Sequence, residues 1–174
     1  IKKDSKISIA AACFSIYAFQ ELKEQLKSVK ELRFIFTSPT FIPEKTKKEK
    51  REFYIPRLNR ERSLYGTEFE IKLRNEMTQK AIARECAEWI KEKVIFKSNI
   101  SDKSIQGQLV IDDIGYTPIN NFTTVELGCE KGNVISSTIV KDKSLAQALL
   151  RDFNEIWNDK RVLQEVTDEV IDSI

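Results

Sequence analysis

The chain carries two short apolar runs, Ile7-Ser8-Ile9-Ala10-Ala11-Ala12 and Leu32-Arg33-Phe34-Ile35-Phe36, each with the length and composition of a buried β-strand. Between them, apolar residues recur at spacings of three and four. This spacing predicts a helix over residues 15–28, with Ile16, Phe19, Leu22 and Leu26 on its buried side. A strand, a helix and a second strand in this order favour an α/β domain. We therefore predict an α/β fold with a mixed, largely parallel sheet flanked by helices.

The same periodicities continue toward the C-terminus. Residues 81–93 and 145–157 have the apolar faces of amphipathic helices. Strands are predicted over 93–97, over 109–111 between Gly107 and Asp112-Asp113, and over 134–140. A final helix is predicted over 162–174. We expect residues 1–160 to form one domain, and residues 161–174 to lead toward a further domain of a longer polypeptide.

The composition excludes several classes of catalytic site. The 174 residues include 29 Lys plus Arg, 27 Asp plus Glu and no histidine, so the formal net charge is +2. Without histidine, the chain cannot form a Ser-His-Asp or Cys-His nucleophile, a His general base or a His-ligated zinc site. The hydrophobic fraction of 41% is enough for one core of ordinary size.

Cysteine usage and the length of the apolar runs indicate the compartment. Cys13, Cys86 and Cys129 lie far apart and form no Cys-x-x-Cys pair. Free thiols in a cytoplasmic protein are therefore expected, rather than disulfides or a thiolate metal site. The apolar run at 7–19 is too short to span a bilayer. We expect no metal, no cofactor and no membrane contact for these residues.

A basic stretch interrupts the α/β pattern within an expected exposed insertion over residues 41–66. Between residues 44 and 62, eight basic and four acidic side chains give a net charge of +4, and Phe53 and Tyr54 are interleaved with them. Lys and Arg neutralise phosphates, and exposed aromatic rings stack on bases. The stretch therefore predicts nucleic-acid contact, with a solvated, salt-bridged loop as the alternative. The candidate residues are Lys45, Lys47, Lys48, Lys50, Arg51, Arg57, Arg60 and Arg62.

One segment resembles a known active-site motif. Ile105-Gln106-Gly107-Gln108-Leu109-Val110-Ile111-Asp112-Asp113 is similar to the His-x-Lys-x4-Asp motif of the phospholipase D superfamily, with Gln106, Gln108 and Asp113 in the His, Lys and Asp positions. Downstream, Asn120-Asn121-Phe122-Thr123 resembles the Gly-Ser-x-Asn-Phe-Thr segment of many members, and Leu127-Gly128 and Asn133 match later landmarks. Residues 9–19 and Phe153-Asn154-Glu155-Ile156-Trp157 resemble the first strand and the closing helix of such domains.

The two glutamines depart from the superfamily pattern. In active members, the His attacks phosphorus and the Lys neutralises the phosphate oxygens. An amide is neither nucleophilic nor basic, so this reaction is not expected through Gln106 and Gln108. The two side chains could instead hydrogen-bond a phosphate or a partner group, or be ordinary polar residues at a decayed site.

The remaining polar residues of this region have structural interpretations. Asp112-Asp113 follows a predicted strand, where turn capping is the ordinary role. Asn121 and Thr123 are expected to brace that loop through side-chain hydrogen bonds. Glu126 and Asp142 are carboxylates of the kind that bind metal, but their spacing does not predict a metal site.

The combination is most similar to the phospholipase-D-like domains at the N-terminus of bacterial superfamily-2 helicases of the SNF2 or DEAD/DEAH type. The resemblance implies that ATP binding and helicase activity, a hydrolase reaction, belong to a downstream domain. No Gly-x4-Gly-Lys-Ser/Thr motif lies in these residues. Such domains build one active centre from two motif copies around a two-fold axis. The single copy here predicts a homodimer with Gln106 and Gln108 near its seam.

We therefore predict a non-catalytic accessory domain of a bacterial DNA helicase or restriction-type ATPase that engages DNA or dimerises. Two alternatives stay open. One is a phosphodiesterase or nuclease with a rearranged site, using Asp113, Glu126 and a divalent metal. The other is a pure protein-interaction module.

Overall fold

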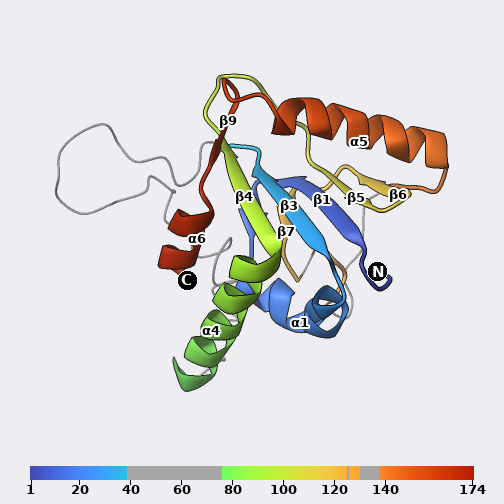
Figure 1. Ribbon diagram of the computed structural model, residues 1–174. Coiled ribbons are helices and arrows are strands. Elements are labelled where there is room, and N and C mark those ends of the chain that lie inside the picture. The colour runs from blue at the N-terminus through green and yellow to red at the C-terminus, as the bar shows by residue number, and fades with distance from the viewer. Residues whose placement is uncertain (39–75, 125, 130–137) are drawn as a thin grey trace, which may run out of the picture.

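Three parallel strands form the centre of the molecule. The structure, a computed structural model, describes residues 1–38, 76–124, 126–129 and 138–174, except for the side chains of 76–79 and 138–140. Strands β1 (Lys6–Ala11), β3 (Glu31–Phe36) and β4 (Val94–Asn99) lie side by side in that order (Figure 1). Phe36 pairs with Ala11 on one side and with Ser98 on the other. The carboxyl ends of the three strands therefore meet at one edge, which we call the carboxyl edge.

Antiparallel strands extend the sheet on both sides. Strands β5 (Gln108–Ile111), β6 (Ile114–Thr117) and β8 (Thr138–Val140) follow one another beyond β1, and β9 (Leu163–Glu165) lies beyond β4. The order is β8-β6-β5-β1-β3-β4-β9. The α/β fold with a mixed sheet is thereby confirmed, and the parallel part of this sheet is its three-stranded centre. Two short strands, β2 (Cys13–Phe14) and β7 (Asn121–Phe122), form a separate parallel pair. Strand β2 follows β1 directly in the sequence.

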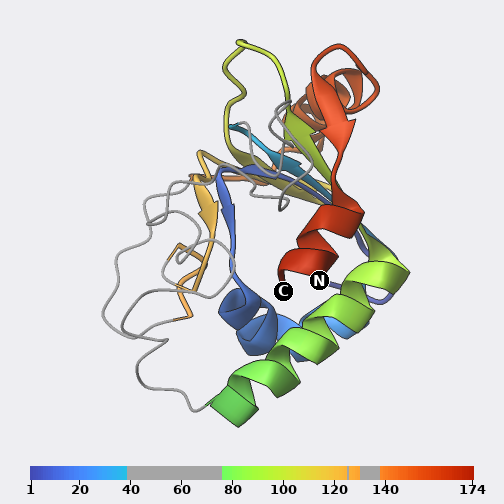
Figure 2. The same cartoon turned by 90° about the vertical axis from the view of Figure 1, so that its left-hand side faces the viewer.

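Aromatic side chains fill one face of the sheet. Phe34, Phe36, Phe96 and Phe14 are fully buried, and their ring centroids lie between 4.9 and 5.8 Å apart. Strand alternation places the three strand residues on one side, and complete burial of each contributes roughly 1.5–3 kcal/mol. Helices α1 (Ile16–Lys27), α4 (Glu76–Lys93) and α6 (Thr167–Ser173) cover this face (Figure 2).

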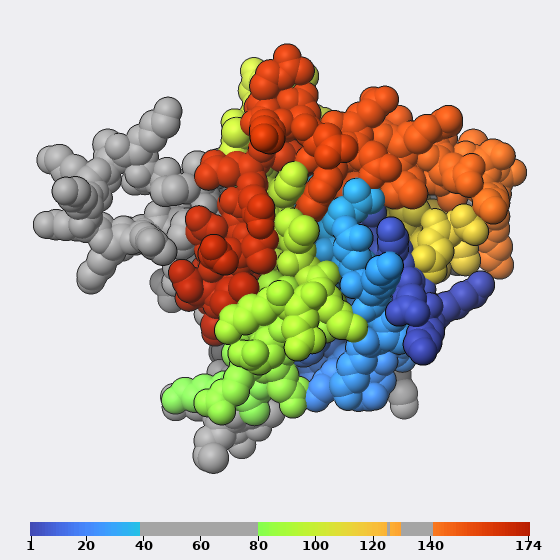
Figure 3. Space-filling view, viewed as in Figure 1, coloured from blue at the N-terminus to red at the C-terminus, as the bar shows by residue number. Residues whose placement is uncertain are grey.

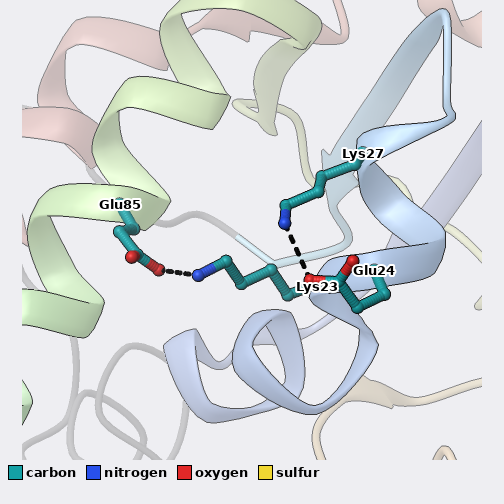
Figure 4. Close-up of polar contacts among 4 residues, drawn as sticks. All are labelled: Lys23, Glu24, Lys27 and Glu85. Carbon is teal, nitrogen blue, oxygen red and sulfur yellow. Dashed lines mark hydrogen bonds and ion pairs between the residues drawn. The ribbon is translucent and has the colours of Figure 1, made fainter.

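Polar contacts hold α1 and α4 together beneath the sheet. Lys23 of α1 pairs with Glu85 of α4, next to the 2.7 Å pair of Lys27 with Glu24 (Figure 4). At the end of α1, the Trp89 indole N–H donates to the Leu26 carbonyl at 3.3 Å. The Leu26 carbonyl also accepts from the Val29 N–H at 3.2 Å, so the indole adds a further hydrogen bond that ties α4 to the end of α1.

Helix α5 (Lys143–Trp157) lies on the opposite face of the sheet (Figure 2). The Asp142 carboxylate caps its first turn by accepting from the Leu145 backbone N–H at 3.0 Å. Phe153 and Trp157 are buried against Ala10 and Ile35 of the central strands. This helix was expected over 145–157, and the prediction is confirmed.

The last predicted helix is wrong in its first half. Leu163–Glu165 form β9, which pairs with Lys97–Asn99 of β4, and α6 begins only at Thr167. Local periodicity missed this strand because its stability comes from pairing with a partner more than sixty residues away. Strand β6, which forms a hairpin with β5, was also not predicted. Residues 41–66 and 134–137, expected as an insertion and as part of a strand, lie outside the described residues. In the described ranges, no helix combines the length and apolar character needed to cross a membrane.

Candidate functional site

The two motif glutamines lie at the carboxyl edge. Strand β5 runs antiparallel to β1, and Gln108 pairs with Ala10 near the end of that strand. Gln106 is exposed in the preceding loop, whereas Gln108 is half-buried. The Gln108 side-chain Nε2 donates to the Leu149 carbonyl of α5 at 3.3 Å. Gln108 therefore joins the sheet to helix α5.

Gly107 lies between these glutamines in the sequence. A glycine is required there because the backbone of other segments packs closely against it. A Cβ at this position would overlap the Ile119 carbonyl oxygen and lie 3.3 Å from the Ala10 carbonyl oxygen. The Gly107 carbonyl also accepts from the Ile119 N–H at 3.3 Å. The glycine thus lets the segment around Ile119 approach β5.

Asp112 and Asp113 form the turn of the β5–β6 hairpin, at the other end of β5. Asp112 has a φ of 51°, a left-handed conformation that Asp tolerates better than most residues. Its carboxylate accepts from the Ser5 hydroxyl at 2.7 Å and from the Lys6 N–H at 3.0 Å. Asp112 thus ties the turn to the start of β1, and capping of the turn's own backbone stays a prediction. Asp113 is exposed and lies 4.0 Å from the Lys143 ammonium.

Glu126 holds the segment after β6 in a compact turn. Its carboxylate accepts from the backbone N–H groups of Asn120 and Asn121, both at 3.0 Å, and from the Asn121 side-chain amide. The Thr123 hydroxyl accepts from the Glu126 N–H at 3.4 Å. Asn121 and Thr123 thus brace the turn at 120–127, and the expectation that they brace the Asp112-Asp113 loop is wrong. The sequence spacing did not reveal this role because the Asn121–Glu126 contact depends on the turn itself.

The carboxylates required by the nuclease alternative lie near opposite ends of strand β1. Asp113 follows Asp112, which is hydrogen-bonded to Lys6 at the start of β1. Glu126 is hydrogen-bonded to Asn120, whose carbonyl accepts from the Ala12 N–H, just past the end of β1, at 2.6 Å. At about 3.3 Å per residue along β1, these places are about 20 Å apart. Asp142, the N-cap of α5, is committed to the Leu145 N–H. Within the part of the chain that the structure describes, no three His, Cys, Asp or Glu side chains gather as a metal centre.

The eight basic candidates from Lys45 to Arg62 lie outside the described residues, but the point where their segment leaves the sheet is described. Strand β3 ends at Phe36, and the Thr37 N–H donates to the Ala11 carbonyl at 3.0 Å. Gln108 flanks the same end of β1 on its other side. With neighbouring strands 4.7–4.9 Å apart, the end of β3 lies about 10 Å from Gln108 across β1.

Two cations that were not predicted as site residues, Arg33 and Lys97, lie between the sheet and α5. The Arg33 guanidinium lies 5.0 Å from the Phe153 ring centre and 5.5 Å from that of Trp157. The Lys97 ammonium lies 4.4 Å from the Trp157 ring centre. Strand alternation was the available signal, because it places Arg33 and Lys97 on the face opposite the phenylalanine core. Burial lowers the pKa values of both side chains.

The three cysteines form no disulfide with one another in the structure. Cys13 and Cys86 are buried, and Cys129 is half-buried. Burial of Cys86 between α1, α4 and the sheet raises the pKa of its thiol, because the apolar surroundings disfavour the thiolate. This thiol is a core residue rather than a nucleophile.

No protein-family model, curated protein or solved structure matches this chain.

Proposed function

We propose that this chain is a non-catalytic, phospholipase-D-like accessory domain of a cytoplasmic bacterial DNA helicase or restriction-type ATPase, and that it engages DNA. The family and the helicase context rest on the resemblance of residues 105–113 and 120–123 to that superfamily. ATP binding and hydrolysis belong, in this proposal, to another part of a longer polypeptide.

The observation that carries the non-catalytic assignment is the hydrogen bond from Gln108 to the Leu149 carbonyl. The residue in the Lys position holds α5 in place, and the residue in the His position, Gln106, carries an amide that cannot attack phosphorus. Loss of a positioned nucleophile costs several powers of ten in rate. Binding without turnover is the function that this arrangement supports best.

The composition of the basic stretch and the exposure of Gln106 support DNA engagement. The described chain leaves β3 at Phe36, and Thr37 lies on the other side of β1 from Gln108. In open α/β sheets, ligands commonly bind outside the carboxyl ends of the strands. In this proposal the basic side chains from Lys45 to Arg62 bind DNA, and the exposed Gln106 amide donates to a phosphate oxygen.

The test combines binding with cleavage. The 174-residue chain is incubated with fluorescently labelled single- and double-stranded oligonucleotides, with and without Mg²⁺ or Mn²⁺, and both anisotropy and strand integrity are followed. We expect binding with intact strands under all conditions. Metal-dependent cleavage that disappears in Asp113→Ala would overturn the non-catalytic assignment. Absence of binding at low salt, together with a dimer in sedimentation analysis, would assign the chain to protein interaction instead.

A further inference from the structure

We propose that Arg33, Lys97 and Lys160 form a binding surface for a phosphate group beside the C-terminal end of α5. None of the three residues belongs to the basic stretch, and all three lie in the described part of the chain. The inference that this phosphate belongs to DNA rests on the proposed function. The inference that a phosphate site exists does not rest on it.

The positive charges of Arg33 and Lys97 are only partly compensated. Within the described residues, neither side chain makes an ion pair with a carboxylate, although Glu165, the cross-strand neighbour of Lys97, and Glu31 oppose their charges from farther away. Burial lowers the pKa of Lys97, and the charges of Lys160 and Arg33 lower it further, against the opposing charge of Glu165. Burial also lowers the pKa of Arg33, opposed by Glu31. A bound anion would offset the cost of holding these cations together.

Arg33 and Lys97 carry more hydrogen-bond donors than the described structure engages. The Arg33 guanidinium gives one contact to the Ser8 hydroxyl, at 2.9 Å, and the Lys97 ammonium gives one to the Trp157 carbonyl, at 2.8 Å. A guanidinium has five N–H donors and an ammonium has three, so both groups retain donors beyond these contacts in the described structure. Arg in particular presents a planar pair of donors that matches two phosphate oxygens.

The row of the sheet that contains Arg33 is open to solvent. Ile95 pairs with Arg33 in the register of β3 and β4, and it is 38% exposed although it lies in a central part of the sheet. Helix α5 therefore leaves this row of the sheet open. Figure 3 shows atoms of β3 and β4 at the surface between α5 and α4. An anion can approach Arg33 across this opening, while the aromatic rings of α5 hold the guanidinium from the other side.

A purely structural role gives a different expectation. Lys97 satisfies a carbonyl at the C-terminus of α5, and cations at that end of a helix are stabilising. If this were the whole role of the cluster, phosphate would have no specific effect on it.

A phosphate titration followed by tryptophan fluorescence distinguishes a phosphate site from a purely structural role. The chain has two tryptophans, and Trp89 lies between α1 and α4 on the other side of the sheet. A Trp89→Phe variant reports on Trp157 alone. Inorganic phosphate is added against sodium chloride at constant ionic strength. We expect a saturable change in Trp157 emission, and a rise of about 3 °C in the Tm of the wild-type chain at saturating phosphate.

Substitutions identify the ligands. In the Trp89→Phe background, Arg33→Gln is expected to weaken phosphate binding about tenfold, as loss of a charge-assisted contact should. Arg33→Lys keeps the charge and is expected to restore part of the affinity. Lys160→Gln alters an exposed residue, so it tests the site even if changes at Arg33 impair folding. Lys91→Gln, on the exposed side of α4, is the matched control and should bind phosphate as the parent does.

An unsaturable response, or equal affinities in Arg33→Gln, Lys160→Gln and Lys91→Gln, would overturn the phosphate site. The source of the phosphate follows from a second titration with an oligonucleotide. Competition between the oligonucleotide and phosphate for the same emission change supports a site for the nucleic-acid backbone. A phosphate response without an oligonucleotide response supports the site for free phosphate. If the chain also fails to bind DNA elsewhere, the proposed function fails while the phosphate site stands.

Discussion

The side-chain amide of Gln108 donates a hydrogen bond to the backbone carbonyl of Leu149, 3.3 Å away, and so joins strand β5 to helix α5. In the resemblance to the phospholipase D superfamily, this residue occupies the position of the lysine that neutralises phosphate oxygens. One of its two amide N–H donors is used inside the fold. The side chain that would bind phosphate in the superfamily makes a structural contact here.

Gln108→Ala should destabilise the chain by about 1 kcal/mol, the usual net value of a half-buried hydrogen bond. For a protein of this size, the Tm should fall by roughly 2–4 °C. Gln106→Ala is the neighbouring control and should change stability by less than about 0.5 kcal/mol, because Gln106 is exposed. Urea unfolding of the two variants measures both. Equal stability of the two variants would contradict a structural role for Gln108.

Gly107→Ala should be far more damaging than either glutamine substitution. The added methyl would overlap the Ile119 carbonyl oxygen, a backbone atom that cannot move away without displacing the segment before Asn120. We expect a loss of about 3 kcal/mol, at the upper end of the cost of overpacking. Thermal unfolding followed by circular dichroism measures it. A wild-type Tm would show that the loop at 118–120 does not lie against β5.

Lys93 should contribute to stability through the end of α1. Its ammonium donates to the carbonyls of Lys27 and Val29 at 2.7 and 2.8 Å, which satisfies two groups near a helix C-terminus. Lys93→Met should therefore cost about 1–3 kcal/mol. Lys91→Met, two residues earlier, loses only an exposed pair with Glu88 and should cost less than about 1 kcal/mol. Comparable losses in the two variants would contradict the capping role.

Stability should fall at alkaline pH because of Cys86. Burial raises the pKa of this thiol in the folded chain, so above the ordinary thiol pKa the unfolded chain releases a proton that the folded chain retains. The contribution is fully present below about pH 8.5 and falls by about 1.4 kcal/mol per pH unit above it. Urea unfolding of wild type and Cys86→Ala between pH 7.5 and 10 measures the difference. A stability difference that stays constant with pH would show that Cys86 reaches solvent.

The sequence predicted the elements whose apolar spacing spans several residues. The strand–helix–strand opening and the helix containing Phe153 and Trp157 have enough periodic positions to identify both type and place. Strands β6 and β9 have four and three residues, too few for periodicity to distinguish them from other structure. A signal for β6 was present in Asp112-Asp113, because Asp tolerates a positive φ and a two-residue turn joins antiparallel strands.

The candidate site was harder to predict for a related reason. The place of Asp112 after a strand predicts a turn, but the groups that its carboxylate binds, Ser5 and Lys6, are more than one hundred residues away. Glu126 looked like a possible metal ligand because a carboxylate in sequence shows no partner. Only the folded turn reveals that backbone N–H groups occupy it. Arg33 and Lys97 were missed because no local pattern shows which helix covers them.

The salt dependence of DNA binding tests the central claim most directly. The dissociation constant is measured from low to moderate salt for the wild-type chain and for a variant in which the eight basic residues from Lys45 to Arg62 are replaced by glutamine. A control variant removes the same charge from exposed residues elsewhere: Lys2, Lys3, Lys30, Lys80, Arg84, Lys91, Lys141 and Arg151. Each lost phosphate contact should reduce the slope of log K against log salt by about 1.

We predict wild-type binding that weakens steeply with salt, a much shallower slope in the Lys45–Arg62 variant, and a near wild-type slope in the control. Equal slopes in the two variants, or no binding by the wild-type chain at low salt, would contradict the proposal that this domain engages DNA through its basic stretch.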